Sequence, residues 1–158
     1  MRPPAWNSDG GSLIFPGFDK NVWRLWRVDL DRGNRLVPLP YTGWIDIKIR
    51  GHKLYGERFG SAGVWRIDGI PRRITPQSIP ENIGHWTIAG DEIVYVDVRS
   101  SGQVIGQPVE GGASHILAQA PNYVFDGGLG WDPTTHSLAY VAYLSMDADI
   151  ELLHLARR

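Results

Sequence analysis

The chain has no cysteine and only two methionines among its 158 residues. Without thiols it has no disulfide, no thiolate metal site and no cysteine nucleophile. The absence of cysteine is compatible with both oxidising and reducing compartments, so it does not indicate where the protein is located. No apolar run approaches the roughly 20 residues that span a bilayer, and the start lacks the basic, apolar and small-residue order of a signal peptide. We therefore expect no membrane contact by this segment.

An excess of charge of either sign is also missing. The 16 Lys and Arg residues and 17 Asp and Glu residues leave a net charge of −1. Because nucleic acids are bound chiefly through a positive field, we expect no direct nucleic acid contact by this segment. Hydrophobic residues at 42% and charged residues at 21% indicate a folded domain and exclude a disordered tail.

Glycine, proline and tryptophan are plentiful, with 19, 11 and 7 residues. This composition favours many short strands joined by tight turns. Glycine or proline also interrupts almost every window that could hold the 3.6-residue period of a helix. The sequence therefore predicts an all-β fold.

Aromatic residues recur with a period near 40 residues. Two series show it, namely Trp6, Trp44, Trp86 and Trp131, and Phe15, Tyr55, Tyr95 and Tyr140. A strand-built repeat of this length is typical of propeller blades, which stack because one sheet cannot bury both of its faces alone. Tryptophans could also be stacking platforms for sugars or bases. Their recurrence favours wedges between sheets, and we expect at least five of the seven in the core.

The sequence thus predicts a β-propeller, or a propeller fragment, of about four antiparallel four-stranded blades. They occupy approximately residues 4–40, 41–77, 79–120 and 122–157 of a single propeller-type domain, and the last blade lacks its outer strand. Closed propellers have about four to eight blades. We interpret the chain as a fragment, as half of a homodimer that completes the ring, or as a tight four-bladed ring.

The motif from Pro4 to Phe15 resembles the blade signature of TolB-like, WD-type propeller repeats, in which Pro-x-Trp-Ser-Pro-Asp-Gly precedes a strand. Asn7 and Ser8 depart from the usual Ser-Pro. The segment Val64–Gly69, followed by Arg73–Thr75, resembles the second half of the same repeat. The resemblance implies a fold, because this family serves as a scaffold in many contexts.

The segment Trp86–Tyr95 further resembles the propeller part of bacterial CadC-like winged-helix regulators. In such proteins a DNA-binding domain, and often a transmembrane helix, precede the propeller. The resemblance implies the sensor or interaction part of a transcriptional regulator, periplasmic if it is tethered to a membrane and cytoplasmic otherwise. The alternative is the accessory propeller of a prolyl oligopeptidase-family serine peptidase whose catalytic domain is absent here, since no Gly-x-Ser-x-Gly nucleophile motif occurs.

We found no residue pattern for catalysis, metal binding or a cofactor. The five histidines show no ligand spacing. The segments Asp29–Asn34 and Asp147–Asp149 resemble the opening of a calcium loop, but the later ligands are missing, which favours turn capping. A glycan-cleaving propeller needs paired carboxylates, and the dispersed acids indicate none. We expect no enzymatic activity.

The remaining hypothesis is a noncatalytic module that binds a protein or small-molecule ligand with the loops at one end of the propeller. The residues that we expect in this site are Tyr41, Asp46, Arg58, His85, Arg99, Tyr123 and Asp126. A second feature is a group of arginines on the third and fourth strands of the blades. Solvated edges that discourage strand addition are the favoured interpretation, and a docking surface for an acidic partner is the alternative.

Overall fold

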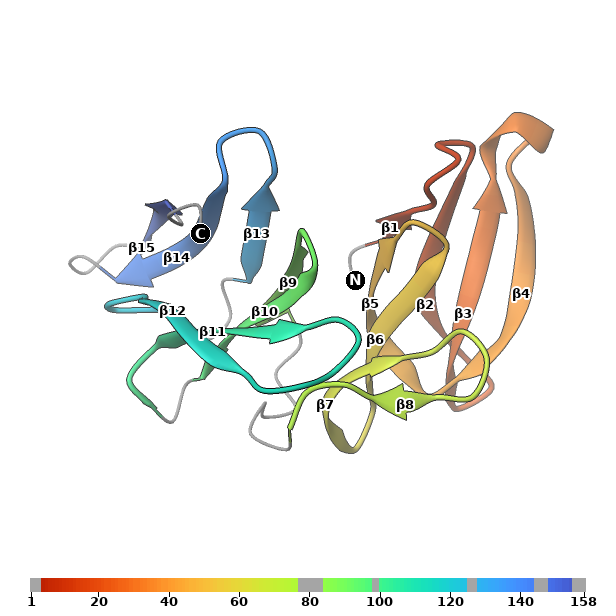
Figure 1. The fold of residues 1–158 in the computed structure, drawn as a ribbon. Coiled ribbons are helices and arrows are strands. Elements are labelled where there is room, and N and C mark those ends of the chain that lie inside the picture. The colour runs from red at the N-terminus through yellow and green to blue at the C-terminus, as the bar shows by residue number, and fades with distance from the viewer. Residues whose placement is uncertain (1–3, 77–83, 98–99, 125–127, 144–147, 155–158) are drawn as a thin grey trace. The chain divides into compact units, whose positions relative to one another are not determined.

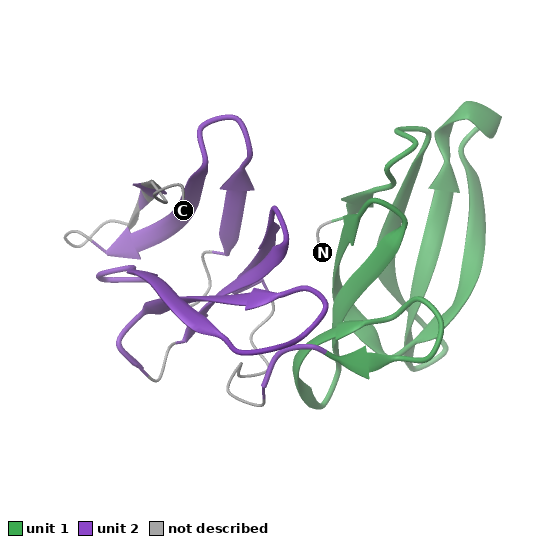
Figure 2. Cartoon of the chain, viewed as in Figure 1, with its two compact units in different colours: residues 1–73 green, residues 74–158 purple. Residues whose placement is uncertain are grey.

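The computed structural model describes residues 4–76, 84–97, 100–124, 128–143 and 148–154, and these form a β structure with one short 3-10 helix (Figure 1). The chain divides into two compact units, residues 1–73 and 74–158 (Figure 2). No helix in the described ranges has the length and apolar character needed to cross a membrane.

The first unit holds two antiparallel sheets of four strands each, both in sequence order. The strands of sheet 1 are β1 (Ala5–Trp6), β2 (Ser12–Asp19), β3 (Val22–Asp29) and β4 (Arg35–Thr42), with the 3-10 helix η1 (Leu30–Arg32) before β4. The strands of sheet 2 are β5 (Trp44–Arg50), β6 (Lys53–Arg58), β7 (Ser61–Arg66) and β8 (Arg72–Arg73).

The second unit repeats this arrangement. The strands of sheet 3 are β9 (Trp86–Ala89), β10 (Glu92–Asp97), β11 (Gln103–Pro108) and β12 (His115–Gln119). Sheet 4 has three strands among the described residues, namely β13 (Leu129–Asp132), β14 (Ser137–Tyr143) and β15 (Ala148–His154). Each sheet is therefore a meander built from one stretch of chain, as expected of a propeller blade.

Tight turns keep each meander local. In sheet 1, Lys20 and Asn21 both have positive φ angles, 47° and 65°, which is the geometry of a two-residue type I′ hairpin. The apolar run Ser12–Phe15 suggests a strand that ends at Phe15, but β2 continues through Pro16 as far as Asp19 and pairs with β3 over its whole length. The hairpin is this long because its turn needs only Lys20 and Asn21.

Each unit has its own apolar core. In the first unit, Ala5 and Leu25 of sheet 1 pack with Trp44, Ile47 and Leu54 of sheet 2. In the second unit, residues from sheet 3 pack against residues from sheet 4, and the buried members are Val94, Val96, Val104, Ala120, Leu129, Leu138, Tyr140 and Ala142. Neighbouring sheets within a unit thus cover one another's faces.

The tryptophans correct one prediction from the sequence. Only Trp44 and Trp86 are fully buried, whereas Trp6 is 60% exposed and the other four are half-buried. The tryptophans that define the repeat are also not equivalent, because Trp86 lies opposite Tyr95 whereas Trp131 lies opposite Leu138, two residues before Tyr140. The expected core of at least five tryptophans is therefore wrong, since strand register sets which face of a sheet each one occupies.

Candidate binding site

Two of the residues selected from the sequence, His85 and Tyr123, meet in the second unit. The Nδ1 atom of His85 lies 2.5 Å from the hydroxyl of Tyr123, and the two rings pack edge to face with centroids 5.4 Å apart. His85 directly precedes β9, and its carbonyl accepts a hydrogen bond from Val96 of β10. Tyr123 is held by an isolated β-bridge to Ala142 of β14. The contact therefore links sheets 3 and 4.

The environment of this pair is apolar enough to affect ionisation. His85 is 2% exposed, and the ring of Tyr123 packs on the buried Tyr140 with centroids 6.0 Å apart. Burial raises the pKa of Tyr123 well above its usual value of 10.0. The phenol therefore stays neutral at any physiological pH and acts as a hydrogen-bonding group rather than as a base.

A cavity of about 290 Å³ lies beside Tyr123, and its described lining residues are Ser101, Gly102, Asn122 and Tyr123. The backbone shapes it, because Ser101, Gly102 and Asn122 have φ angles of 58°, 87° and 55°. At Gly102 a Cβ atom would lie 2.4 Å from the carbonyl oxygen of Ala120, so no larger residue fits. A short hydrogen bond from the Gln119 side chain to the Ser101 carbonyl braces the loop.

The other predicted site residues lie elsewhere or outside the description. Tyr41, Asp46 and Arg58 belong to the first unit, whereas Arg99 and Asp126 lie outside the described residues. Tyr41 is half-buried against the core of the first unit, and Asp46 is 0% exposed. Arg58 is exposed, and its guanidinium lies 6.0 Å from the ring centroid of Trp44.

Asp46 takes part in a feature that the sequence analysis missed. It lies directly opposite Glu57 on β6, and Glu57 is only 3% exposed. Lys48 approaches Asp46 with its Nζ 3.9 Å from Oδ1. No residue pattern indicates this pair, because an irregularity in the register between Trp44 and Asp46 decides which residues face each other. Both carboxylates are buried, so the pair is no open acid-base site of the glycosidase type.

Three arginines of the third and fourth strands, Arg27, Arg66 and Arg73, contact side chains of their own sheet or of the turn that follows it. Arg27 contacts the carboxylate of Asp29 at 2.7 Å, and Arg66 contacts that of Asp68 at 2.8 Å. Arg73 lies over the ring of Trp65, 5.9 Å from its centroid. These contacts stiffen the outer strands. Solvation alone, the favoured interpretation from the sequence, does not describe Arg27 and Arg66.

A second, polar cavity of about 250 Å³ lies at the turn end of sheet 1. Its lining residues are Asp9, Gly11, Ser12, Arg27, Asp29, Asp31 and Arg32. Turn capping by the aspartates of Asp29–Asn34 is not seen at Asp29, because its carboxylate binds Arg27 and makes no cap hydrogen bond to η1. In the other segment, Asp147 lies outside the described residues. No group of three His, Asp or Glu side chains placed to hold a metal ion occurs among the described residues. Within this cavity the carboxylate of Asp29 is paired with the guanidinium of Arg27.

Comparison with known proteins gives a fold and no family. No protein-family model and no curated protein matches the chain. Among solved structures, TolB from Acinetobacter baumannii superposes with a TM-score of 0.73 at 19% sequence identity, over 96% of this chain and 40% of that one. The chain therefore has the fold of a stretch of blades of a TolB-like β-propeller. This confirms the predicted fold class and the TolB-like part of the resemblance, and the chain spans less than half the length of that neighbour.

Two other solved structures are similar at lower TM-scores. They are the AtxE2 isopeptidase in its apo form, with a TM-score of 0.36 and 13% identity over 90% of this chain and 29% of that one, and a protein described as TolB from Agrobacterium tumefaciens, with a TM-score of 0.33 and 15% identity over 96% and 46%. No comparison supports the resemblance to CadC-like regulators.

Proposed function

We propose that this chain is a noncatalytic binding module, and that its ligand occupies the cavity beside Tyr123 in the second unit. The observation that carries the proposal is the contact of Tyr123 with His85, which fixes a neutral phenol at the wall of a cavity. Binding sites are commonly concave, preformed and provided with a few fixed polar groups. This cavity is at the small end of the usual range.

The lining residues indicate the class of ligand. Ser101 and Asn122 are exposed polar side chains, and Tyr123 adds an aromatic face. None of the described lining residues carries a charge. Hydroxyl and carboxamide groups both donate and accept hydrogen bonds, which suits the amide groups of a short peptide segment better than an ion. We therefore propose an uncharged peptide segment as the ligand.

The test uses N-acetyl dipeptide amides as probes, with binding followed by ligand-observed NMR on the purified chain. We expect the wild type to bind a subset of these probes, and Asn122→Gly to weaken their binding at least about fivefold, as loss of a good hydrogen bond does. Asn34→Gly is the matched control, because Asn34 also has a positive φ angle, 59°, but lies in the first unit. No binding by the wild type, or equal weakening by both variants, would refute the proposal.

The narrower proposal, that the module is the sensor or interaction part of a bacterial transcriptional regulator, rests on the resemblance of Trp86–Tyr95 alone. The coding sequence around this segment tests it. A winged-helix domain upstream is the expected result. A hydrolase domain with a Gly-x-Ser-x-Gly motif downstream would instead establish the alternative, the accessory propeller of a serine peptidase.

A further inference from the structure

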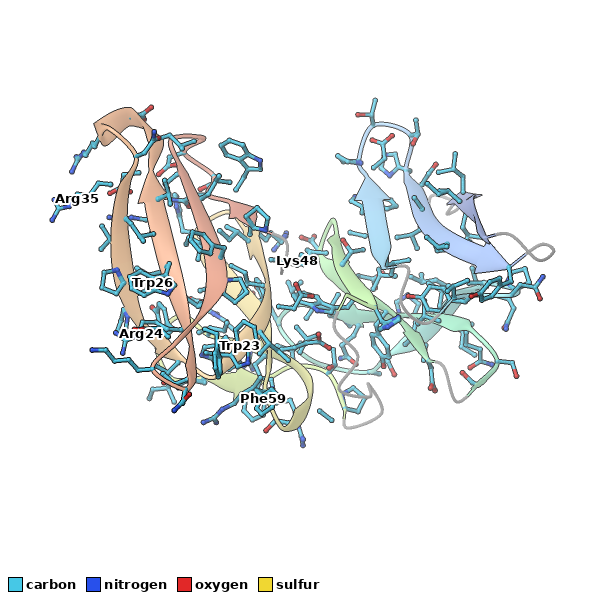
Figure 3. All side chains as sticks on the ribbon, turned by 180° about the vertical axis from the view of Figure 1, so that it is seen from behind. Trp23, Arg24, Trp26, Arg35, Lys48 and Phe59 are labelled. Carbon is cyan, nitrogen blue, oxygen red and sulfur yellow. The ribbon has the colours of Figure 1, made fainter. Side chains whose placement is uncertain are left out.

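Three aromatic side chains gather at one end of the first unit. We call the aromatic patch the surface formed by Phe18, Trp23 and Phe59. Phe18 and Trp23 lie opposite each other next to the type I′ turn of the β2–β3 hairpin, and their rings pack edge to face with centroids 5.3 Å apart. Phe59 lies in the turn between β6 and β7. Figure 3 shows Trp23 and Phe59 at the same end of the unit.

Backbone hydrogen bonds hold these turns together. The Phe59 amide donates to the Gly43 carbonyl, and the Gly43 amide donates to the Trp23 carbonyl, both at 2.7 Å. Gly43 connects β4 to β5 and has a φ angle of 82°, a conformation that favours glycine. Sheets 1 and 2 are thus joined at this end by main-chain contacts, so the aromatic patch is preformed within the first unit.

The aromatic patch lies on the side of sheet 1 that meets sheet 2. Side chains alternate along a strand, so Trp23 shares a face with Leu25, and Phe18 lies on that face too. Leu25 is 0% exposed in the core that the two sheets share. Beyond this core, Phe18 and Phe59 are 62% and 68% exposed. The exposure therefore arises where two adjoining sheets of one unit end, and not on a face that lacks a neighbouring sheet.

Positive charge borders the aromatic patch. Arg58 directly precedes Phe59 and is exposed, and its Nε lies 3.5 Å from the position that a Cβ atom on Gly43 would take. The Arg58 side chain therefore lies against the backbone link that joins the two sheets. Lys20, which is also exposed, occupies the hairpin turn two residues after Phe18.

The carboxylates next to these turns do not offset that charge at the surface. Asp19 follows Phe18 in β2, so its side chain points to the opposite face of sheet 1. Glu57, the neighbour of Arg58, is only 3% exposed. Exposed cations and aromatic rings therefore share one side of the described turns, and the neighbouring carboxylates do not. A partner that complements this side is acidic and carries an apolar side chain.

We propose that the aromatic patch is a second binding surface, and that it docks an acidic peptide segment of a partner protein with an apolar side chain at its centre. Aromatic and arginine side chains are the residue types that contribute most to the energy of protein–protein contacts. A nucleic acid strand needs a track of cations along its backbone, and Lys20 and Arg58 supply only two charges. The surface belongs to the first unit, whereas the cavity beside Tyr123 belongs to the second.

Peptide binding followed by heteronuclear NMR tests the surface. The probes are three N-acetyl pentapeptide amides, Asp-Glu-X-Glu-Asp with Leu, Phe or Trp at X, and their uncharged Asn-Gln-X-Gln-Asn counterparts. Affinities are read from the amide signals of Gly43 and Phe59, so that binding in the second unit is measured separately. We expect at least one acidic probe to bind at least about fivefold more tightly than its uncharged counterpart. Raising NaCl from about 0.05 M to about 0.5 M should weaken it, because salt screens exposed charges.

Substitutions locate the contact. Phe59→Ser and Arg58→Gln should each weaken binding of the acidic probe at least about fivefold, whereas Arg58→Lys keeps the charge and should lose less. Ile70→Ser is the matched control, since Ile70 is 91% exposed in the first unit but lies between β7 and β8, and it should bind as the wild type does. Wild-type melting temperatures in these variants exclude misfolding as the cause of a loss.

Four results would overturn the proposal. The first two are no binding of any acidic probe at the Gly43 and Phe59 signals, and equal affinity there for acidic and uncharged probes. The third is an equal loss of binding in Ile70→Ser and Phe59→Ser. The fourth is tighter binding of a short oligothymidylate than of every acidic peptide at the same signals, because the surface would then be one for nucleic acid.

Discussion

At the scale of the residue, the Arg66–Asp68 pair ties β7 to the start of β6. The carboxylate of Asp68 accepts hydrogen bonds from Arg66 and from the Leu54 amide, at 2.8 Å and 3.1 Å for the closest contacts. Burial alone would raise the pKa of Asp68, but these hydrogen bonds and the positive charge of Arg66 outweigh it and hold the pKa below the ordinary 3.8.

We predict that Asp68→Asn destabilises the chain by about 1 kcal/mol at pH 7, because a charge-assisted contact at a partly exposed site is lost. The folded pKa is lowered, so the stabilisation is complete above the unfolded pKa and disappears as the pH falls through the folded pKa. The difference from wild type in urea midpoints should therefore be constant above about pH 5 and shrink below 3.8. A difference independent of pH would contradict the assignment.

The hydrogen bond between Tyr123 and His85 can be tested in the same way. Tyr123→Phe keeps the ring contact with Tyr140 but removes the hydroxyl that bonds the buried His85. We expect a loss of about 1 to 2 kcal/mol in unfolding free energy, since His85 loses a buried partner. Tyr143→Phe, at an exposed tyrosine, is the control and should change little. Thermal unfolding by circular dichroism measures both, and equal losses would show that the buried bond contributes nothing.

At the scale of the element, Gly56 of β6 shows that packing around sheet 2 depends on a small residue. A Cβ atom there would lie 2.6 Å from the backbone oxygen of Asp46 and 2.8 Å from Cδ1 of Ile67. We predict that Gly56→Ala destabilises the chain by about 1 to 3 kcal/mol, the usual cost of overpacking a core.

Gly130 of β13 supplies the matched control for that substitution. It is also a strand glycine, but the nearest atom to an added Cβ is that of Ala139 at 4.0 Å. Gly130→Ala should be neutral or stabilising by a few tenths of a kcal/mol, because it only reduces the freedom of the unfolded chain. Urea midpoints of both variants check the comparison. Equal effects of the two would mean that backbone freedom, and not the close approach, decides the outcome.

At the scale of the element, the sequence predicts the strands but not the register in which they pair. The all-β fold with about four antiparallel sheets could be predicted, because glycine and polar turns delimit apolar runs such as Glu92–Asp97 and Ser137–Tyr143. Cross-strand register is a different matter. The Asp46–Glu57 pair depends on an irregularity in β5 that has no residue signature.

The candidate site was predicted only in part. His85 and Tyr123 were both selected from the sequence, but nothing in it indicates that they touch. They are 38 positions apart, and they adjoin two different sheets. Ser101, Gly102 and Asn122 were missed. In the sequence they are only a Ser-Gly and an Asn in loops, which is a weak indication of a site. Their positive φ angles, seen only in the structure, turn these loops back so that they line the cavity.

At the scale of the whole molecule, the two units have separate cores. Leu25, Trp44 and Ile47 lie in the core of the first unit, and Val94 and Leu138 lie in that of the second. Cooperative units of unfolding usually coincide with such clusters of buried contacts.

We predict that Leu25→Ala, at a side chain 0% exposed, destabilises mainly the first unit, by about 2 to 5 kcal/mol, because it leaves a cavity in that core alone. Hydrogen exchange followed by mass spectrometry should show faster exchange in β2, β3 and β5 and little change in β10 and β14. Val94→Ala, also 0% exposed, is the reciprocal variant and should accelerate exchange in β10 and β14. Equal acceleration throughout the chain in both variants would show one cooperative unit, since a shared unfolding step transmits any loss of stability to every amide.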